Sequence, residues 1–451
     1  MEKRTDMRAE ALDTLIDIER NKKLSHIAIG ETLMRHQFEK KSDRAFYTRL
    51  CEGVTERKIY LDYILDTYSK TPMRKCKPLI RSLLRMGAYQ ILFMDVRDAA
   101  ACSEAVSLAK KRGFARLSGF VNGVLRTIVR EKDRLPVPDK KEFDKYLSTT
   151  YSVPEWLSRL MIDQYGAQTA EMMFASFLEA RPLTIRTNLS VITPEALEEE
   201  LKKEGVSVER GTYLPYALTI SHLNYLGKLA AFRQGKFAVQ DESSQLAVEV
   251  ADINEGDFVL DVCAAPGGKT FHAADRLHGT GKVLSRDLTE YKTDLIEENK
   301  DRMCYENVEV QQWDALVEDE SLLESVDVLL ADLPCSGLGI MGRKNDIKYQ
   351  MTQQQLSELA QLQRNILSVI WKYVKPGGEM IFSTCTLNRG ENIENIRWIE
   401  ENTPMRLVSI EDYLPETLKG RTGSQGYLQL IPGKDSCDGF FISKFERPEA
   451  R

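Results

Sequence analysis

Apolar residues recur at the three- and four-residue spacing of a helix face throughout the first third of the chain. The spacing predicts helices separated by short breaks, over residues 11–16, 61–68, 79–92, 103–109 and 119–126. No strand-like alternation interrupts residues 6–134. The predicted first domain is therefore an all-helical bundle over residues 1–135.

A short polar stretch with two prolines separates this bundle from a mixed segment. Pro136 and Pro138, followed by charged residues, predict a linker over 136–150. Beyond the linker, helical and extended patterns alternate at residues 155–164, 167–179, 183–188, 194–204, 206–208 and 217–220. These elements predict a small α+β unit over residues 151–239.

The next part of the chain, residues 240–446, alternates near-continuous apolar strands with helices. The strands are expected at residues 258–262, 282–287, 308–311, 326–332, 379–384 and, late in the chain, 440–445. The intervening helices are expected at residues 270–277, 290–303 and 353–373. Apolar strands that alternate with helices predict an α/β domain, in which helices cover both faces of a parallel sheet.

The composition is that of an ordinary globular protein and excludes several other classes. Of the 451 residues, 42% are hydrophobic and 29% are charged, which excludes a disordered chain. No stretch approaches the roughly 18 consecutive apolar residues of a membrane span, and residues 1–6 lack the apolar segment of a secretory signal. Eight scattered cysteines, without a C-x-x-C pair or a histidine cluster, argue against a zinc site and against disulfides. We expect a cytoplasmic protein with no metal and no membrane contact.

Charge is divided unevenly along the chain. Residues 1–135 carry 28 Lys and Arg against 18 Asp and Glu, whereas the remainder carries 34 against 50. A basic first third suggests contact with a polyanion, although a charged helical surface without a ligand explains the same numbers. If a nucleic acid is the partner, the residues expected to track its phosphates include Arg81, Arg85, Lys110, Lys111, Arg112 and Arg126.

A glycine-rich turn follows the first strand of the α/β domain. It reads Cys263-Ala264-Ala265-Pro266-Gly267-Gly268-Lys269-Thr270, and its small residues let backbone N–H groups approach a ligand at the start of the next helix. A phosphate-binding P-loop would need glycine where Cys263 stands, and the G-x-G-x-x-G pattern is absent. Residues 263–269 are therefore predicted to bind a nucleoside cofactor that lacks phosphates.

Three carboxylates stand where successive strands of the predicted sheet end. Asp287, Asp314 and Asp332 follow the second, third and fourth strands. In a doubly wound sheet such residues face one crevice, where a carboxylate accepts hydrogen bonds from ribose hydroxyls. We expect Asp287 at the ribose and Asp314 at the adenine edge, although a single aspartate is more often a helix cap or a turn residue.

Two cysteines lie just beyond adjacent strands. Cys335 belongs to Asp332-Leu333-Pro334-Cys335-Ser336-Gly337, and Cys385 belongs to Ser383-Thr384-Cys385-Thr386. A buried cysteine is usually a small apolar core residue, but the turn residues around both cysteines are less usual for a core position. A thiolate is a strong nucleophile that suits addition to an electron-poor ring carbon. Residue chemistry alone does not say which cysteine attacks.

Taken in order, these motifs resemble those of the RNA (cytosine-C5) methyltransferases over about residues 240–446. The helical first domain resembles the RNA-binding NusB fold, most clearly at Gly119-Phe120-Val121-Asn122-Gly123-Val124-Leu125-Arg126. The middle unit, around Arg181-Pro182-Leu183-Thr184-Ile185-Arg186-Thr187-Asn188, is similar to the RNA-recognition-like extension of the RsmB (Fmu/Sun) enzymes. The resemblance implies a multidomain protein that ends in a Rossmann-like class I methyltransferase domain with a seven-stranded, mostly parallel sheet.

The resemblance also implies an activity. A methyl group would pass from S-adenosyl-L-methionine to carbon 5 of a cytosine in 16S ribosomal RNA, cytosine 967 in the family. Cys385 would be the nucleophile, Cys335 would assist release, and Asp332 would hold the base and border the cofactor. Lys269 either lines the same pocket or is a solvated lysine at a helix start.

The expected partner is 16S ribosomal RNA, either naked or in an early small-subunit particle, and the expected oligomeric state is a monomer. The target base must leave its stack to enter an active-site pocket, so a loop or an opened helix is the expected substrate. Two alternatives stay open at this point. One is the same chemistry on transfer RNA, and the other is a non-catalytic RNA-binding or antitermination protein.

Overall fold

The computed structural model describes residues 5–223 and 225–449, which form two compact units. The first unit contains the chain up to Glu179 together with Met341–Met351. The second contains Ala180–Ile340 and the chain from Thr352 onward. The predicted boundaries at residues 135 and 150 lie inside the first unit, and the predicted unit over residues 151–239 is divided between the two units at Glu179 and Ala180. The domain boundaries stay predictions.

Within residues 5–179, the first unit contains helices and no strand, as predicted. Asp6 caps the first helix by accepting a hydrogen bond from the N–H of Ala9 at 3.2 Å, and Pro78 begins the fifth, where the missing N–H costs nothing. The apolar residues that predicted these helices, such as Leu12, Leu61 and Leu84, pack into one buried core. The helices that share this core are α1 (Met7–Asn21), α2 (Ser25–Arg35), α3 (Lys41–Glu56), α4 (Lys58–Tyr68), α5 (Pro78–Phe93), α6 (Asp98–Lys111) and α7 (Ser118–Glu131).

A segment that is distant in sequence completes the first unit. Three helices follow the bundle, namely α8 (Phe143–Tyr151), α9 (Glu155–Tyr165) and α10 (Ala167–Ser176). The short helix α16 (Ile347–Gln350) joins them from the other half of the chain. The Asp346 carboxylate accepts from the N–H and the hydroxyl of Ser25 at 2.7 and 2.8 Å, and the Tyr349 hydroxyl donates to the Ser152 carbonyl at 3.0 Å. These bonds hold Met341–Met351 among the helices.

The second unit contains a small antiparallel sheet. Its strands, in the order β2-β3-β1-β4, are β2 (Ser207–Arg210), β3 (Ala217–Ser221), β1 (Leu183–Thr187) and β4 (Phe237–Val239). Two helices, α11 (Pro194–Lys203) and α12 (Ala230–Arg233), pack against it around Ile185, Leu197 and Phe237. The sequence predicted three of these strands and missed β4, because three residues are too few to show an alternating pattern.

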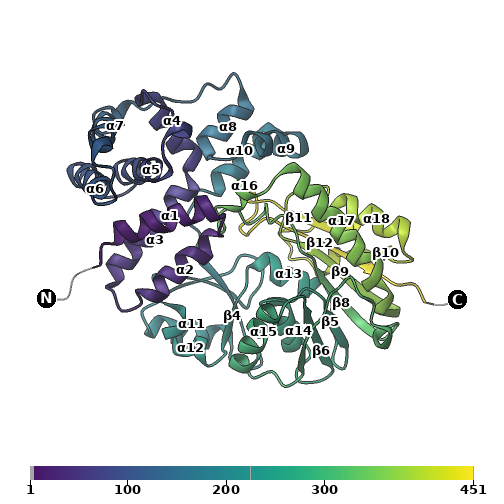
Figure 1. Ribbon diagram of the computed structural model, residues 1–451. Coiled ribbons are helices and arrows are strands. Elements are labelled where there is room, and N and C mark those ends of the chain that lie inside the picture. The colour runs from purple at the N-terminus through teal and green to yellow at the C-terminus, as the bar shows by residue number, and fades with distance from the viewer. Residues whose placement is uncertain (1–4, 224, 450–451) are drawn as a thin grey trace. The chain divides into compact units, whose positions relative to one another are not determined.

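The large sheet of the second unit has a parallel centre and an antiparallel edge (Figure 1). Its order is β10-β12-β9-β8-β5-β6-β7, with β11 paired to β12 beside this path. The parallel strands are β5 (Phe258–Asp261), β6 (Lys282–Asp287), β7 (Val308–Gln312), β8 (Val326–Asp332) and β9 (Val374–Thr384). The antiparallel ones are β10 (Arg406–Leu407), β11 (Tyr427–Leu430) and β12 (Phe440–Glu446). Within the described residues the sheet therefore has eight strands rather than the predicted seven, because β11 adds to β12 outside the main path.

Helices cover both faces of the large sheet, as the apolar strands predicted. On one face Val259 and Val283 share a core with α13 (Glu242–Val250), α14 (Gly268–Arg276) and α15 (Glu290–Met303). On the other face Leu260 and Leu284 share a core with α17 (Gln353–Ile370) and α18 (Ile393–Asn402). Because side chains alternate along a strand, consecutive residues of β5 and β6 enter opposite cores.

A buried ion pair fixes the small sheet against the large one. Arg186 of β1 and Asp275 of α14 are both buried, and Nη1 of the arginine lies 2.7 Å from Oδ2 of the aspartate. Arg186 also donates through Nε to the Gln240 side chain at 3.1 Å. Gln240 lies just before α13, so the hydrogen bonds of Arg186 extend to the edge of the candidate site.

Candidate active site

The turn after β5 folds tightly enough to require glycine. Gly267 has a φ of +98°, and a Cβ atom there would lie 2.3 Å from the Phe271 ring. The N–H of Gly267 donates to the Ala264 carbonyl at 2.7 Å, which closes the turn just before α14 begins at Gly268. The turn therefore sits at the amino end of a helix, where N–H groups are free for an anionic ligand group.

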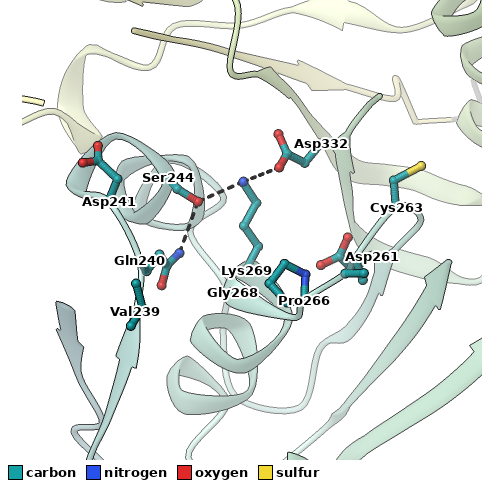
Figure 2. A pocket seen from close by; sticks show the side chains of 12 residues that line it. Val239, Gln240, Asp241, Ser244, Asp261, Cys263, Pro266, Gly268, Lys269 and Asp332 are labelled. Carbon is teal, nitrogen blue, oxygen red and sulfur yellow. Dashed lines mark hydrogen bonds and ion pairs between the residues drawn. The ribbon is translucent and has the colours of Figure 1, made fainter. Parts of the chain in front are cut away.

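A cavity opens between this turn and the approach to α13 (Figure 2). Its volume is about 160 Å³, and it is partly open to solvent. Its lining contains six of the seven predicted turn residues, all but Gly267. Sequence reasoning missed the other wall, which the residues before and within α13 supply. The complete lining is Val239, Gln240, Asp241, Ser244, Asp261, Cys263, Ala264, Ala265, Pro266, Gly268, Lys269 and Asp332.

Lys269 reaches across this cavity to Asp332. Its Nζ lies 2.6 Å from Oδ2 of Asp332 and donates to the Ser244 hydroxyl at 2.9 Å, as Figure 2 shows. The same ammonium lies 4.9 Å from the centre of the Phe440 ring, within cation–π range. Lys269 is buried, so of the two sequence-based alternatives the structure selects the pocket-lining lysine over the solvated one.

Asp332 keeps part of its carboxylate accessible. It ends β8, and its Oδ1 accepts from the Ser383 hydroxyl at 2.8 Å, across from Lys269 on Oδ2. About 32% of the side chain is exposed. The carboxylate is thus fixed by two partners while one edge stays open to the cavity.

Asp261 is a cavity residue whose role the sequence did not reveal. One oxygen, Oδ2, accepts from the Thr270 hydroxyl at 2.8 Å, while Oδ1 is buried without a hydrogen-bond partner among the described residues. Burial is the main cause that raises the pKa of this carboxyl to about 7. A buried acceptor that faces a cavity is a position for a donor from a ligand. Its place at the end of β5, directly before the turn, was the available signal.

Asp287 meets the predicted turn, but Asp314 makes only a local contact. Asp287 ends β6 and its Oδ2 accepts from the N–H of Ala265 at 3.0 Å, while Lys292 lies 2.9 Å from Oδ1. Asp314 accepts from the N–H of Leu316 at 3.0 Å. This contact is typical of a turn residue, which was the other interpretation of a single aspartate in the sequence. Neither carboxylate is part of the cavity lining, so their cofactor contacts stay predictions.

The two predicted cysteines lie side by side. The Sγ atoms of Cys335 and Cys385 are 3.3 Å apart, at the carboxyl ends of adjacent strands β8 and β9. The hydrogen bond to Cys385, followed by burial, raises the pKa of the Cys335 thiol well above its ordinary value. Two sulfurs this close disfavour a double negative charge, so the pair holds one thiol beside one potential thiolate.

The six basic residues of the first unit divide into three kinds. Arg85 is buried, and its guanidinium makes two 2.7 Å hydrogen bonds to Asp62, so the prediction of a phosphate contact is wrong for this residue. Arg81 is also largely buried and lies 2.8 Å from Glu19. The other four side chains are exposed. Lys111 and Arg112 have acidic neighbours. Lys110 and Arg126 complete the exposed group.

Among residues 5–223 and 225–449, no helix is both long and apolar enough to cross a bilayer. Over the same residues, no three His, Cys, Asp or Glu side chains gather in a way that could hold a metal ion.

Comparison with known protein families matches three consecutive parts of the chain. Residues 248–446 match the family described as 16S rRNA methyltransferase RsmB/F. Residues 5–130 match the NusB family, and residues 153–224 match the ferredoxin-like domain of the RsmF/B-like methyltransferases. The order of the three matches is the order that the sequence motifs predicted.

Individual proteins are similar over nearly the whole chain. The probable ribosomal RNA small subunit methyltransferase B of Bacillus subtilis (strain 168) is 35% identical, with 99% of each chain covered. The ribosomal RNA small subunit methyltransferase B of Vibrio cholerae is 29% identical, with 89% of each chain covered. The crystal structure of PH0851 superposes with a TM-score of 0.82 at 25% identity, covering 98% of this chain and 99% of that one. NSun6 from Pyrococcus horikoshii, solved with SFG, has the same fold over 69% of this chain and 98% of its own, with a TM-score of 0.57 at 23% identity.

Proposed function

Because this chain belongs to the RsmB/F family of 16S rRNA methyltransferases, we propose that it methylates carbon 5 of a cytosine in 16S ribosomal RNA, cytosine 967 in the family. S-adenosyl-L-methionine is the cofactor of this family, as the sequence predicted. The family assignment does not specify the modified atom, the modified base or the covalent route, and these three are what we propose.

The observation that carries the proposal is the cysteine pair beside Asp332. Methyl transfer to an amino group or a hydroxyl needs no thiol, whereas carbon 5 of cytosine is a poor nucleophile until a thiolate adds to carbon 6. Two sulfurs 3.3 Å apart supply such a nucleophile together with a second thiol. Asp332 lies on the same strand end as the Cys335 loop and adds a fixed carboxylate.

The protein side chains then act in sequence on the base. The Cys385 thiolate adds to carbon 6, and the electron pair of the ring double bond makes carbon 5 nucleophilic. When bound, S-adenosyl-L-methionine supplies an electrophilic methyl group. Carbon 5 then passes its proton to water, and the electron pair of that C–H bond re-forms the ring double bond as the bond from carbon 6 to Cys385 breaks and its electron pair leaves with the sulfur. The raised pKa of Cys335 favours its thiol form, which assists release by donating a hydrogen bond to the departing Cys385 sulfur.

Asp332 and Lys269 stabilise the charge that appears during addition. Addition at carbon 6 places extra electron density on the ring, which is neutralised when the base enters with a proton on N3. The Asp332 carboxylate would hold that protonated base by accepting a hydrogen bond from N3–H or from the exocyclic amine. The Asp332 carboxylate is held by Lys269 and Ser383, so it is oriented before the base arrives. A preorganised charged group of this kind contributes more than one that must reorient during the reaction.

The residues around the cavity fit the cofactor by their chemistry. The cofactor carries an ammonium, a carboxylate and ribose hydroxyls, and the cavity offers a partner for each. Asp261 has an unpaired buried oxygen for a cationic donor, and the start of α14 offers N–H groups to a carboxylate. Asp287 would accept from the ribose hydroxyls, and Asp314 would border the adenine.

The direct test is methyl transfer from labelled S-adenosyl-L-methionine to 16S ribosomal RNA and to transfer RNA. The wild type, Cys385→Ala and Cys335→Ala are compared, and a denaturing gel detects protein that stays attached to RNA. We expect 16S ribosomal RNA to be labelled by the wild type and not by Cys385→Ala. We also expect Cys335→Ala to leave a covalent protein–RNA complex that Cys385→Ala does not form.

Two outcomes would change the proposal. Labelling of transfer RNA alone would replace the substrate while keeping the chemistry. Full activity of Cys385→Ala would contradict the covalent route, since no addition to carbon 6 would then depend on that sulfur.

A further inference from the structure

Glu391 is a fully buried carboxylate that the proposed reaction does not use. It lies six residues beyond Cys385 and directly before α18, with no exposed surface. Its two oxygens accept four hydrogen bonds, and all four donors are uncharged groups. Burying a carboxylate among neutral partners is costly, so its retention calls for a reason in what it holds.

The first set of contacts holds the loop that carries Cys335. The N–H of Ser336 donates to Oε2 of Glu391 at 2.8 Å, and the Ser336 hydroxyl donates to Oε1 at 2.6 Å. Gln363 of α17 donates both to Oε2 at 3.2 Å and to the Pro334 carbonyl at 2.9 Å. The residues on either side of Cys335 are therefore tied to Glu391, one directly and one through Gln363.

The second set of contacts holds the loop that carries Cys385. The Asn388 side chain donates to Oε1 of Glu391 at 3.0 Å. The Ser336 hydroxyl lies 2.7 Å from the Thr386 hydroxyl, next to Cys385. The N–H of Gly339 donates to the Cys385 carbonyl at 3.0 Å, which adds a direct link between the loops. The network thus spans both loops with Glu391 at its centre.

We propose that Glu391 is a positioning residue that holds the Cys335 loop against the Cys385 loop and so keeps the two thiols in register for release of the methylated base. The inference rests on the proposed function, because it concerns the same pair of sulfurs. Glu391 touches neither sulfur by hydrogen bond in the described contacts and acts through Ser336, Gln363 and Asn388.

The donors explain why this position needs a carboxylate rather than an amide. The backbone N–H of Ser336 can only donate a hydrogen bond, so a glutamine at position 391 must point its side-chain oxygen towards that N–H. Its NH₂ would then face the Ser336 hydroxyl and Asn388, which both donate in the present arrangement. Those two groups would have to reverse, and the hydroxyl contact to Thr386 would be disturbed. The negative charge of Glu391 also helps to raise the pKa of Cys335, after the Cys385 hydrogen bond and burial.

The test compares Glu391→Gln with the wild type and with Glu394→Gln as a matched control. Glu394 lies three residues further along, in the first turn of α18, is exposed and pairs with Arg397. For Glu391→Gln we expect kcat to fall roughly 10- to 100-fold, the loss of one or two hydrogen bonds to a charged acceptor. The KM values for RNA and for S-adenosyl-L-methionine should stay within about two-fold of the wild type, because the hydrogen bonds of Glu391 position the two loops and do not bind either ligand.

The distinguishing readout is the covalent protein–RNA complex on a denaturing gel. If Cys335 is misplaced for release, the fraction of Glu391→Gln trapped on RNA should rise above that of the wild type and of Glu394→Gln. A variant that is merely less stable would lower both turnover and trapping together. Ser336→Ala, which removes one hydroxyl and leaves Glu391 in place, should show the same rise even if Glu391→Gln folds poorly.

Wild-type turnover and wild-type trapping in both variants would overturn the positioning role. That failure is distinguishable from failure of the proposed function. If Cys385→Ala is inactive while Glu391→Gln and Ser336→Ala are normal, only the positioning role falls. If Cys385→Ala is fully active, the covalent route itself falls.

Discussion

Two ion pairs in the second unit contain the same kinds of groups but differ in how much of the carboxylate is exposed. Arg186–Asp275 and Lys269–Asp332 each join a cation to a carboxylate at 2.7 and 2.6 Å, and both cations are buried. In the first pair both oxygens of Asp275 are used by protein donors, which include the N–H groups of Leu189 and Ser190. In the second pair, Asp332 remains about one-third exposed at a cavity.

The difference separates a structural ion pair from the pair that we propose acts in catalysis. Asp275 is held by the charge of Arg186 and by hydrogen bonds from the Ser190 segment, which together lower its pKa despite burial. A carboxylate whose lone pairs are all engaged has nothing to offer a ligand. Asp332 has two fixed partners and an open edge, so it can meet a base without first breaking a bond. The Gln240 and Ser244 side chains link the two pairs, since Gln240 contacts Arg186 and Ser244 contacts Lys269.

The largest effect should come from breaking the closed pair. Arg186→Met leaves a buried carboxylate without its cation, and we expect the free energy of unfolding to fall by about 3–5 kcal/mol. Urea unfolding followed by circular dichroism measures this change. Arg276→Met, at a partly exposed arginine next to Asp275 on α14, is the control and should cost under about 1 kcal/mol. Equal stability of the two variants would contradict the structural role of Arg186.

The open pair should affect catalysis more than stability. Asp332→Asn removes the charge that faces the base, and we expect kcat to fall roughly 100- to 1,000-fold. The unfolding midpoint should also fall, because buried Lys269 loses its counter-charge, but by less than in Arg186→Met, because Asp332 is about one-third exposed. Steady-state methyl transfer together with thermal unfolding separates the two effects. Asp327→Asn is the matched control on the same strand, because Asp327 accepts from the N–H of Phe258 at the opposite end of β8. Normal turnover in Asp332→Asn would remove this residue from the mechanism.

A third effect should be visible in the pH dependence of cofactor binding. Burial raises the pKa of Asp261 to about 7, so the carboxyl is protonated below that pH and ionised above it. A cationic donor prefers the ionised form, and affinity for S-adenosyl-L-methionine should fall up to about tenfold per pH unit below pH 7. Isothermal titration calorimetry between pH 8 and pH 6 measures this slope.

Asp261→Asn is the control for cofactor binding, and it should change stability in the opposite direction. The variant should bind S-adenosyl-L-methionine weakly with little dependence on pH. The raised pKa means that ionisation of Asp261 opposes folding at pH values above its unfolded pKa, so the variant without cofactor should be more stable than the wild type at pH 8. An unchanged pH slope in Asp261→Asn would show that another group titrates.

The smallest effects should come from exposed basic residues of the first unit. Lys110→Gln and Arg126→Gln should each weaken RNA binding a few-fold and lower the slope of log affinity against log salt by about 1 or less. Filter binding at several salt concentrations measures the slope. Arg85→Gln, in contrast, should destabilise the helical unit, because its partner Asp62 would lose a two-point ion pair. A reduced salt slope in Arg85→Gln without loss of stability would restore its predicted phosphate contact.

Elements with a strong local pattern could be predicted from the sequence. The strands β5 and β8 are near-continuous apolar runs, and the turn before α14 is defined by small residues whose spacing excludes a phosphate loop. In contrast, β4 and β10 have three residues or fewer, which is too short for a pattern, and they form only because longer strands offer an edge.

Site residues were predictable where their chemistry is unusual for their position. The cysteines and Asp332 stood out because reactive groups ended apolar strands. Arg85 was misassigned because its charge is visible in the sequence, whereas its burial and its partner Asp62 depend on helix packing. Glu391 and Ser244 gave no signal, since their neighbours come from distant segments that only the fold brings together.

The measurement that most directly tests the central claim is the identity of the methylated nucleoside. Unmodified 16S ribosomal RNA is incubated with the protein and S-adenosyl-L-methionine, digested to nucleosides and analysed by mass spectrometry against standards. The proposed chemistry predicts 5-methylcytidine, and predicts that this product disappears with Cys385→Ala. A product methylated on an exocyclic nitrogen or on a ribose hydroxyl would contradict the account, because neither reaction uses a cysteine nucleophile.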